Sequence, residues 1–142
     1  MDITQLPFNR LIGIESCGAK EDGLLQLSAD SKYQNHVGTV HASALFGLAE
    51  ASSGAFLVAH LKLDPDSIVP ILRRADIKYR KPATGYVYAK GVLKAEDWEV
   101  FHDAYTKRQR ALIGFQIDVL DQDDVIVATA HYEWFVTARP TP

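Results

Sequence analysis

The residue with the clearest capacity for chemistry is Glu50, because it stands alone in a long apolar segment. Between Ala42 and Ala59 it is the only ionisable side chain. A helix that is apolar around most of its circumference is normally buried, and an ionised carboxylate without partners is costly there. Burial raises the pKa of a carboxyl group toward a useful range. Glu50 is therefore a candidate general base or nucleophile.

Three small residues share one side of the predicted helix with Glu50. Ser43, Gly47, Glu50 and Gly54 follow one another at spacings of four, three and four residues, which places them on a single stripe. Small side chains on that stripe leave room for a ligand. The first backbone N–H groups of a helix are unpaired and carry partial positive charge. Those of Ala42 and Ser43 could polarise a carbonyl group and stabilise its oxyanion.

The segment before the helix supplies further polar candidates. Asn35 could orient a water molecule, and His41 could shape the turn or contact the substrate. Two structural interpretations stay open beside these, because Asn is a common turn former and a His in a turn can cap the helix. The expected substrate contacts in this region are Gly38, Thr39, Phe46 and Gly47.

The rest of the chain predicts the elements that surround this helix. The pair Asp22-Gly23 favours a hairpin between strands at 11–19 and 24–29. A loop at 30–40 and the helix at 42–61 follow. Apolar alternation then predicts strands at 67–81, 86–94, 111–120 and 125–137, with a helix over 95–110. One apolar helix among these strands predicts an α+β fold, in which an antiparallel sheet of about five to six strands wraps around the helix.

Composition narrows the classes of function. The 142 residues fit one domain, predicted to span 1–142. A formal net charge of −3 argues against nucleic acid as a partner. The single cysteine excludes an intrachain disulfide, and no histidine spacing suggests a metal site. No secretory signal pattern and no uninterrupted apolar run of about 18 residues is present, so we expect a cytoplasmic protein without a membrane partner.

The element order and the spacing of Asn35, His41 and Glu50 resemble the hotdog-fold acyl-CoA thioesterase superfamily. In its phenylacetate-pathway-type thioesterases, an Asn precedes the His of a His-Gly-Gly turn by six positions, and an acidic residue follows nine positions later. The same spacings occur here, with Ala42 and Ser43 in place of the two glycines and Glu in place of Asp. A related uncharacterised branch of the superfamily is similar as well, and the segment 75–85 is similar to the family's strand and turn after the helix.

The resemblance implies hydrolysis of an acyl-CoA or another acyl thioester. The implied catalytic residues are Asn35, His41, Ala42, Ser43 and Glu50. Coenzyme A would enter as part of the substrate, with no separate cofactor. The resemblance also implies a site between two subunits, and hence a homodimer or a dimer of dimers. Strands rich in Val, Ile and Tyr support this independently, because they leave apolar edges to cover.

A basic cluster lies on the predicted strand after the helix, at Arg73, Arg74, Lys78, Arg80 and Lys81. Of these, Arg74, Arg80 and Lys81 are the expected contacts to the phosphates of coenzyme A, although alternating charges also fit a solvated face. Two other functions stay open. A non-catalytic module could bind acyl-CoA in the same groove, and a hydratase or dehydratase would pair the acid with a histidine, for which His41 is the nearby candidate.

Overall fold

A computed structural model describes residues 1–18, 20 and 22–140 of the chain. The α-helices are α1 (Pro7–Leu11), α2 (Ala42–His60) and α3 (Ala95–Arg108), and short 3-10 turns are η1 (Ile3–Gln5), η2 (Ser31–Tyr33) and η3 (Pro65–Ser67). The strands are β1 (Glu15–Ser16), β2 (Leu25–Leu27), β3 (Ile68–Tyr79), β4 (Val87–Val92), β5 (Arg110–Asp121) and β6 (Ile126–Ala138).

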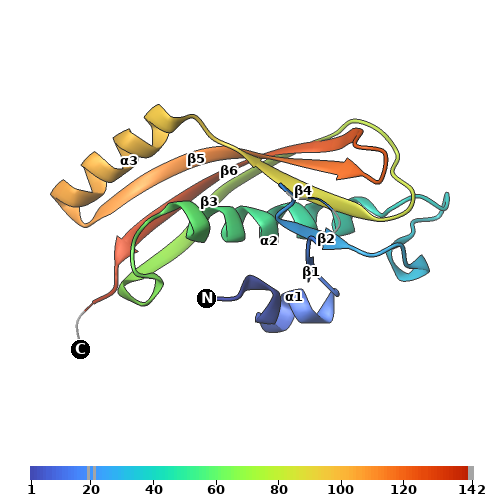
Figure 1. Ribbon diagram of the computed structural model, residues 1–142, viewed down its shortest axis with the longest axis horizontal. Helices are drawn as coiled ribbons and strands as arrows, with labels where there is room; N and C mark the ends of the chain where they lie inside the picture. Colours follow the sequence, from blue (N-terminus) through green and yellow to red (C-terminus); the bar gives the residue numbers. More distant parts are fainter. Residues whose placement is uncertain (19, 21, 141–142) are drawn as a thin grey trace.

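These strands form one antiparallel sheet in the order β1-β2-β4-β5-β6-β3. Figure 1 shows the sheet curving over α2, with α1 on the far side of α2 and α3 at one end of the sheet. The predicted α+β class, with a sheet wrapped around one long helix, is confirmed. The helix was predicted over 42–61 and is found at Ala42–His60.

Helix α2 owes its place to a row of apolar side chains that pack on the sheet. Leu48, Ala49 and Leu57 have no exposed surface. The Phe56 ring lies directly against β4 at Gly91, where a Cβ atom would overlap the ring. By length and composition alone α2 could cross a membrane, and burial in this core accounts for the same apolar composition.

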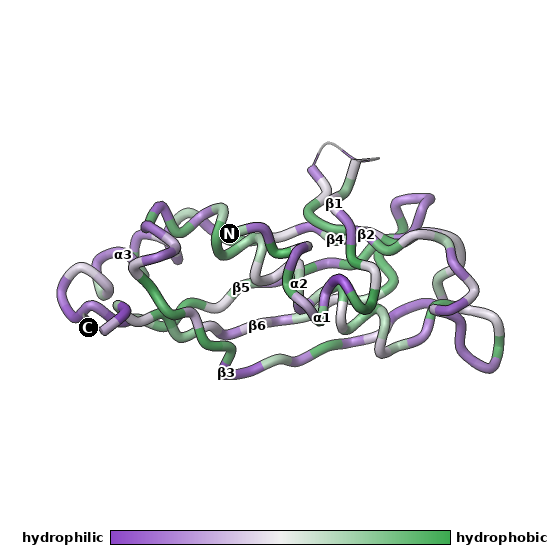
Figure 2. Tube along the Cα trace, turned by 90° about the horizontal axis from the view of Figure 1, so that it is seen from below, coloured by the Kyte–Doolittle hydropathy of each residue, from purple (hydrophilic) through white to green (hydrophobic). Residues whose placement is uncertain are grey.

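Strands β5 and β6 each have a partner strand on both sides and confirm the predicted alternation. Ile113, Phe115, Ile117 and Val119 point into the core, and Figure 2 shows hydrophobic and hydrophilic residues alternating along these strands. The outermost strand, β3, pairs with β6 along one side. In the described part of the chain its other side has no partner, so twelve residues of β3 present an open edge.

The predicted strand over 11–19 is present only in part, although its two strand residues pair antiparallel with β2 as the predicted hairpin requires. The described residues contain helix α1 at Pro7–Leu11 and only a two-residue strand at Glu15–Ser16; Ala19 lies outside the described residues. Proline is favourable in the first turn of a helix, and it occupies that place here. Gly13 then turns the chain with a φ of +73°, a conformation that glycine adopts readily. The side chains of Leu6, Phe8 and Leu11 are exposed on this segment.

Candidate functional site

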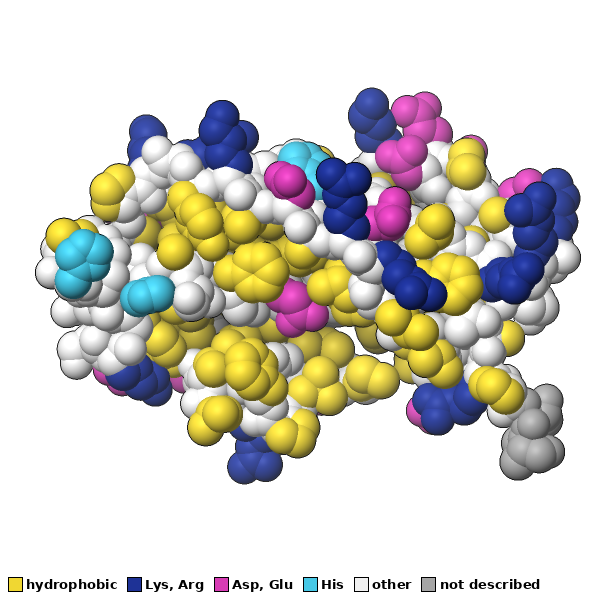
Figure 3. All heavy atoms as spheres, turned by 180° about the vertical axis from the view of Figure 1, so that it is seen from behind, with side chains coloured by type: hydrophobic (Ala, Val, Ile, Leu, Met, Phe, Trp, Pro, Cys, Tyr) yellow, Lys and Arg dark blue, Asp and Glu magenta, His cyan; other side chains and the backbone are white. Residues whose placement is uncertain are grey.

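Glu50 lies on the third turn of α2 and is half-buried. It borders a cavity of about 390 Å³ whose other walls are mostly apolar, including Ile3, Leu6, Phe8, Leu57, Pro70 and Trp134. Burial raises the pKa of the Glu50 carboxyl above its ordinary value. Within the described residues, no hydrogen bond or ion pair to the carboxylate offsets that burial. Figure 3 shows one face of the molecule on which hydrophobic side chains enclose an acidic one.

A chain of hydrogen bonds fixes the cavity wall beside Glu50. The Trp134 indole N–H on β6 donates to Ser53 Oγ at 3.2 Å. The Ser53 hydroxyl in turn donates to the backbone carbonyl of Glu50 at 2.7 Å. Trp134 and Ser53 are both buried, so the bonds tie the sheet to the helix turn that carries the acid.

The backbone N–H of Ser43 is not the free oxyanion donor that the sequence predicts. His41 caps the helix, and its Nδ1 atom accepts a hydrogen bond from the Ser43 N–H at 3.0 Å. The Ser43 N–H is therefore not free. An accepting Nδ1 places the ring hydrogen of neutral His41 on Nε2. No acceptor for the Ala42 N–H is found among the described residues, which leaves Ala42 as the open donor at the helix start.

Asn35 holds the loop that precedes the helix. Its Oδ1 atom accepts hydrogen bonds from the N–H groups of Val37 at 3.0 Å and Thr39 at 3.1 Å. Its Nδ2 atom donates to Thr39 Oγ1 at 2.9 Å. This is the geometry of an Asn that forms a turn, with Gly38 at a φ of +79° inside it. Asn35 thus shapes the loop that leads into His41 and Ala42.

Several of the predicted residues come together at the start of α2. Asn35, Thr39, Ala42, Arg80 and Lys81 line one hollow of about 310 Å³. His41, Ser43 and Gly47 line a second of about 430 Å³ next to α1, and Gly38 lines a smaller one of about 110 Å³. Phe46 packs edge-on against Tyr132, with ring centroids 6.5 Å apart.

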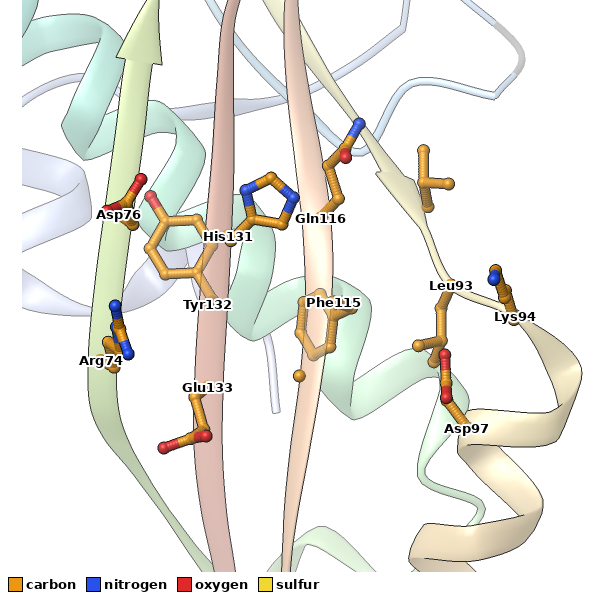
Figure 4. Close-up of a pocket in the computed structure, with 12 residues that line it drawn as sticks. Arg74, Asp76, Leu93, Lys94, Asp97, Phe115, Gln116, His131, Tyr132 and Glu133 are labelled. Carbon is orange, nitrogen blue, oxygen red and sulfur yellow. The ribbon is translucent and has the colours of Figure 1, made fainter.

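Arg74 lies apart from these residues. It borders a hollow of about 640 Å³ on the face of the sheet that points away from α2, together with Asp76, His131 and Glu133. Figure 4 shows these side chains on β3 and β6, with Lys94 and Asp97 on the other side of the hollow. The sheet therefore separates Arg74 from Glu50. The grouping of Arg74 with Arg80 and Lys81 as contacts to one substrate does not fit this placement.

Glu50 and the Ala42 N–H do not meet within one chain. They are eight residues apart on the same helix, so their backbones lie about 12 Å apart along its axis. A base and an oxyanion donor that serve one carbonyl group must each lie about 3 Å from the atoms they contact. Within one chain, the candidate base and the candidate oxyanion donor therefore lie at separate places.

Two residues near Glu50, Tyr132 and Trp134, are predicted from the sequence only as part of a strand and not as part of the site. Trp134 forms a wall of the Glu50 cavity. Tyr132 is 2% exposed, and its hydroxyl has no hydrogen-bond partner among the described residues. The alternation along β6 predicted that both side chains point inward. It carried no information on which helix residues they would meet.

Solved structures of thioesterase-superfamily proteins share this fold. The Pseudomonas aeruginosa protein PA5026, of unknown function and named a probable thioesterase, superposes with a TM-score of 0.79 at 22% identity, over 96% of this chain and 91% of that one. A mutant of the Pseudomonas aeruginosa thioesterase PA1618 gives 0.68 at 15% identity, over 96% and 89%. The Bacillus halodurans protein BH2602, solved with CoA, gives 0.64 at 20% identity, over 91% and 74%. The predicted hotdog fold is confirmed.

Comparison of the sequence with protein-family models assigns the chain to one family. None of the curated proteins matches it. The family model described as "Domain of unknown function (DUF4442)" matches residues 19–136, which is most of the chain. The protein is therefore a member of the DUF4442 family, with the hotdog fold of the thioesterase superfamily.

Proposed function

We propose that the protein hydrolyses an acyl-CoA or a related acyl thioester beside Glu50. The observation that carries this proposal is the half-buried Glu50 carboxylate, without a partner among the described residues, on the wall of an apolar cavity of about 390 Å³. A general base works best when its pKa approaches the working pH, and burial raises the pKa of Glu50 in that direction. Apolar walls suit an acyl chain. The fold shared with PA5026 and with CoA-bound BH2602 supports this substrate class.

The chemistry needs one base and one oxyanion donor. Glu50 takes a proton from a water molecule, and the resulting hydroxide oxygen forms a bond to the thioester carbon. The Ala42 N–H, at the positive end of the α2 dipole, stabilises the negative charge on the carbonyl oxygen. The intermediate then collapses and the carbon–sulfur bond breaks. Glu50 gives its proton to the leaving thiolate, which departs as the free thiol.

Two copies of the chain supply these groups to one site. Since Glu50 and Ala42 of one chain are about 12 Å apart along α2, a two-fold axis that sets two α2 helices antiparallel brings Glu50 of one copy to Ala42 of the other. The open edge of β3 and the exposed side chains of Leu6, Phe8 and Leu11 support such a homodimer. Two such homodimers could associate further into a dimer of dimers.

The phosphates of coenzyme A would bind near the start of α2. Arg80 and Lys81 line a hollow there with Ala42, which carries the proposed oxyanion donor. Arg80 is held by a hydrogen bond from its Nε to Thr129 Oγ1 at 2.9 Å. A nucleotide bound at this end would leave the acyl chain to enter the apolar cavity at Glu50.

One observation favours a non-catalytic acyl-CoA-binding module as the second candidate. The Ser43 N–H is bonded to His41, so the start of α2 offers one open donor in place of two. An oxyanion stabilised by fewer donors forms more slowly, whereas binding of the ground-state thioester depends less on them.

The direct test is release of free thiol from a panel of acyl-CoAs of increasing chain length. We expect wild type to release thiol and Glu50→Gln to lose about 10²–10⁴-fold of that activity. The matched control is Glu99→Gln, which removes an exposed carboxylate on α3 and should leave activity unchanged. Equal rates in wild type and Glu50→Gln would refute the role of Glu50. Tight acyl-CoA binding by calorimetry without thiol release would establish the binding module instead.

A further inference from the structure

The Tyr132 hydroxyl is an isolated polar group in the core. Its side chain is 2% exposed, and its oxygen has no hydrogen-bond partner among the described residues. Burying a hydroxyl without a partner is unfavourable. Phenylalanine would fill the same space without that penalty, so a hydroxyl at this position calls for a partner.

Two other buried side-chain atoms of the described residues also lack partners, and both have a local remedy. The Ser52 hydroxyl is on a helix, where a serine can rotate to bond the carbonyl group four residues earlier. The Gln26 side chain, whose oxygen lacks a partner, is only half-buried, so a small rotation brings that oxygen to water. Tyr132 has neither remedy, because its ring is buried and rigid and holds the hydroxyl away from its own backbone.

The surroundings of Tyr132 contain a carboxylate that can accept its hydrogen bond. Phe46 on α2 packs edge-on against the Tyr132 ring, and Glu50 lies one helical turn beyond Phe46 on the same side. Trp134 is the next inward-facing residue on β6 and borders the Glu50 cavity. The nearby Tyr79 hydroxyl, which donates to the Ala42 carbonyl at 3.2 Å, is a neutral group, so the ionised Glu50 carboxylate is the stronger acceptor.

The electrostatic surroundings of Tyr132 also point to Glu50 as the acceptor. Burial, and after it the Glu50 carboxylate and Tyr79, raise the pKa of the Tyr132 hydroxyl well above its ordinary value. Tyr132 therefore keeps its proton at neutral pH and can donate a hydrogen bond. Among the described residues that line the Glu50 cavity, no other side chain is ionisable. Tyr132 approaches Glu50 from the sheet.

We propose that the Tyr132 hydroxyl donates a hydrogen bond to the ionised Glu50 carboxylate and so positions it as the base. Glu50 reaches this arrangement by rotation of its own flexible side chain, without movement of α2. The bond favours the charged form of the acid and opposes the effect of burial. Only the consequence for catalysis rests on the proposed function. The bond itself is a property of the free protein.

The test follows the carboxyl carbon of Glu50 by ¹³C NMR through a pH titration, with its resonance assigned from Glu50→Gln. We expect Tyr132→Phe to raise the pKa of Glu50, weakening the acid about tenfold. The control is Tyr88→Phe, which removes a buried hydroxyl that donates to Asp124 at 2.6 Å and should leave the Glu50 titration unchanged. An identical titration in wild type and Tyr132→Phe would overturn the proposal, whether or not the protein hydrolyses thioesters.

A reciprocal measurement keeps the test independent of the folding of one variant. In wild type, titration of Glu50 should also shift the ¹³Cζ resonance of Tyr132, and Glu50→Gln should abolish that pH dependence. A pH-independent Tyr132 resonance in wild type would overturn the proposal. If wild type proves active, the acid limb of its kcat/KM profile should move to higher pH in Tyr132→Phe, a change that lost packing alone does not produce.

Discussion

The Trp134 indole N–H on β6 donates a hydrogen bond to the Ser53 hydroxyl oxygen on α2 at 3.2 Å. Ser53→Ala would leave this buried N–H without an acceptor, so we expect a loss of about 1–3 kcal/mol in the free energy of unfolding, measured by urea titration. The adjacent residue provides a matched control. The Ser52 hydroxyl is also buried, but no group of the sheet bonds to it among the described residues, so Ser52→Ala leaves no buried N–H without an acceptor and should be close to neutral. Equal losses in both variants would show that the bond to Trp134 contributes nothing.

The raised pKa of Glu50 predicts a specific pH dependence of stability. Burial lifts the pKa of Glu50 in the folded state above the ordinary value of 4.5. At a pH between 4.5 and the folded-state pKa, the folded protein therefore binds more protons than the unfolded protein. The free energy of unfolding therefore falls as pH rises through this window. Glu50→Gln removes this titration. The free energy of unfolding of Glu50→Gln, relative to that of wild type, should therefore increase from pH 4 toward pH 7, and this increase should occur above about pH 4.5. Parallel pH curves for the two proteins would contradict the burial of this acid.

The opposite placements of Lys81 and Arg74 predict different effects on coenzyme A recognition. Lys81 lines the hollow at the start of α2, whereas Arg74 lies on the far face of the sheet. Lys81→Ala should raise KM for an acyl-CoA about tenfold through loss of a phosphate contact. It should not affect the matching acyl-pantetheine, which lacks the nucleotide. Arg74→Ala should change neither KM. A larger effect from Arg74 would place coenzyme A on the other face.

The Ala42 N–H can be removed with little disturbance to the helix. Ala42 is the first residue of α2, a position at which proline is well tolerated. The preceding His41 has φ −62° and ψ 139°, the extended conformation that a residue before proline prefers. We expect Ala42→Pro to keep the circular dichroism spectrum and to lower kcat about 10²–10³-fold. Ala42→Ser, which keeps the N–H, is the control. Full activity in the proline variant would exclude this donor.

Much of the fold could be predicted from local patterns. A segment with one charge between Ala42 and Ala59 has to be buried, and strict alternation along 111–120 and 125–137 identifies central strands. The region before Asp22 could not be predicted in the same way. Its apolar residues fit either a strand or a short helix, and the choice depends on Pro7 at the helix start and on the turn at Gly13.

The site was predictable in its residues more than in its geometry. The sequence singles out Glu50 because burial of a lone acid is unusual. That His41 bonds the Ser43 N–H depends on a side-chain rotamer that spacing does not determine. Arg74 lies on β3 and Arg80 directly follows its last residue, Tyr79, yet six residues of extended chain separate the two arginines by about 20 Å. The Tyr132 hydroxyl, which has no partner among the described residues, belongs to a ring that packs against Phe46, and spacing along the sequence does not predict a contact between such distant segments.

Subunit mixing tests whether one thioester site uses Glu50 of one chain and Ala42 of another. Glu50→Gln and Ala42→Pro, each inactive alone, are unfolded together, refolded, and assayed for thiol release. Random pairing makes half of the dimers mixed, and each mixed dimer has one intact site, so we expect recovery of about a quarter of wild-type activity. No recovery from a mixture shown by mass spectrometry to contain mixed dimers would contradict a site shared between two chains.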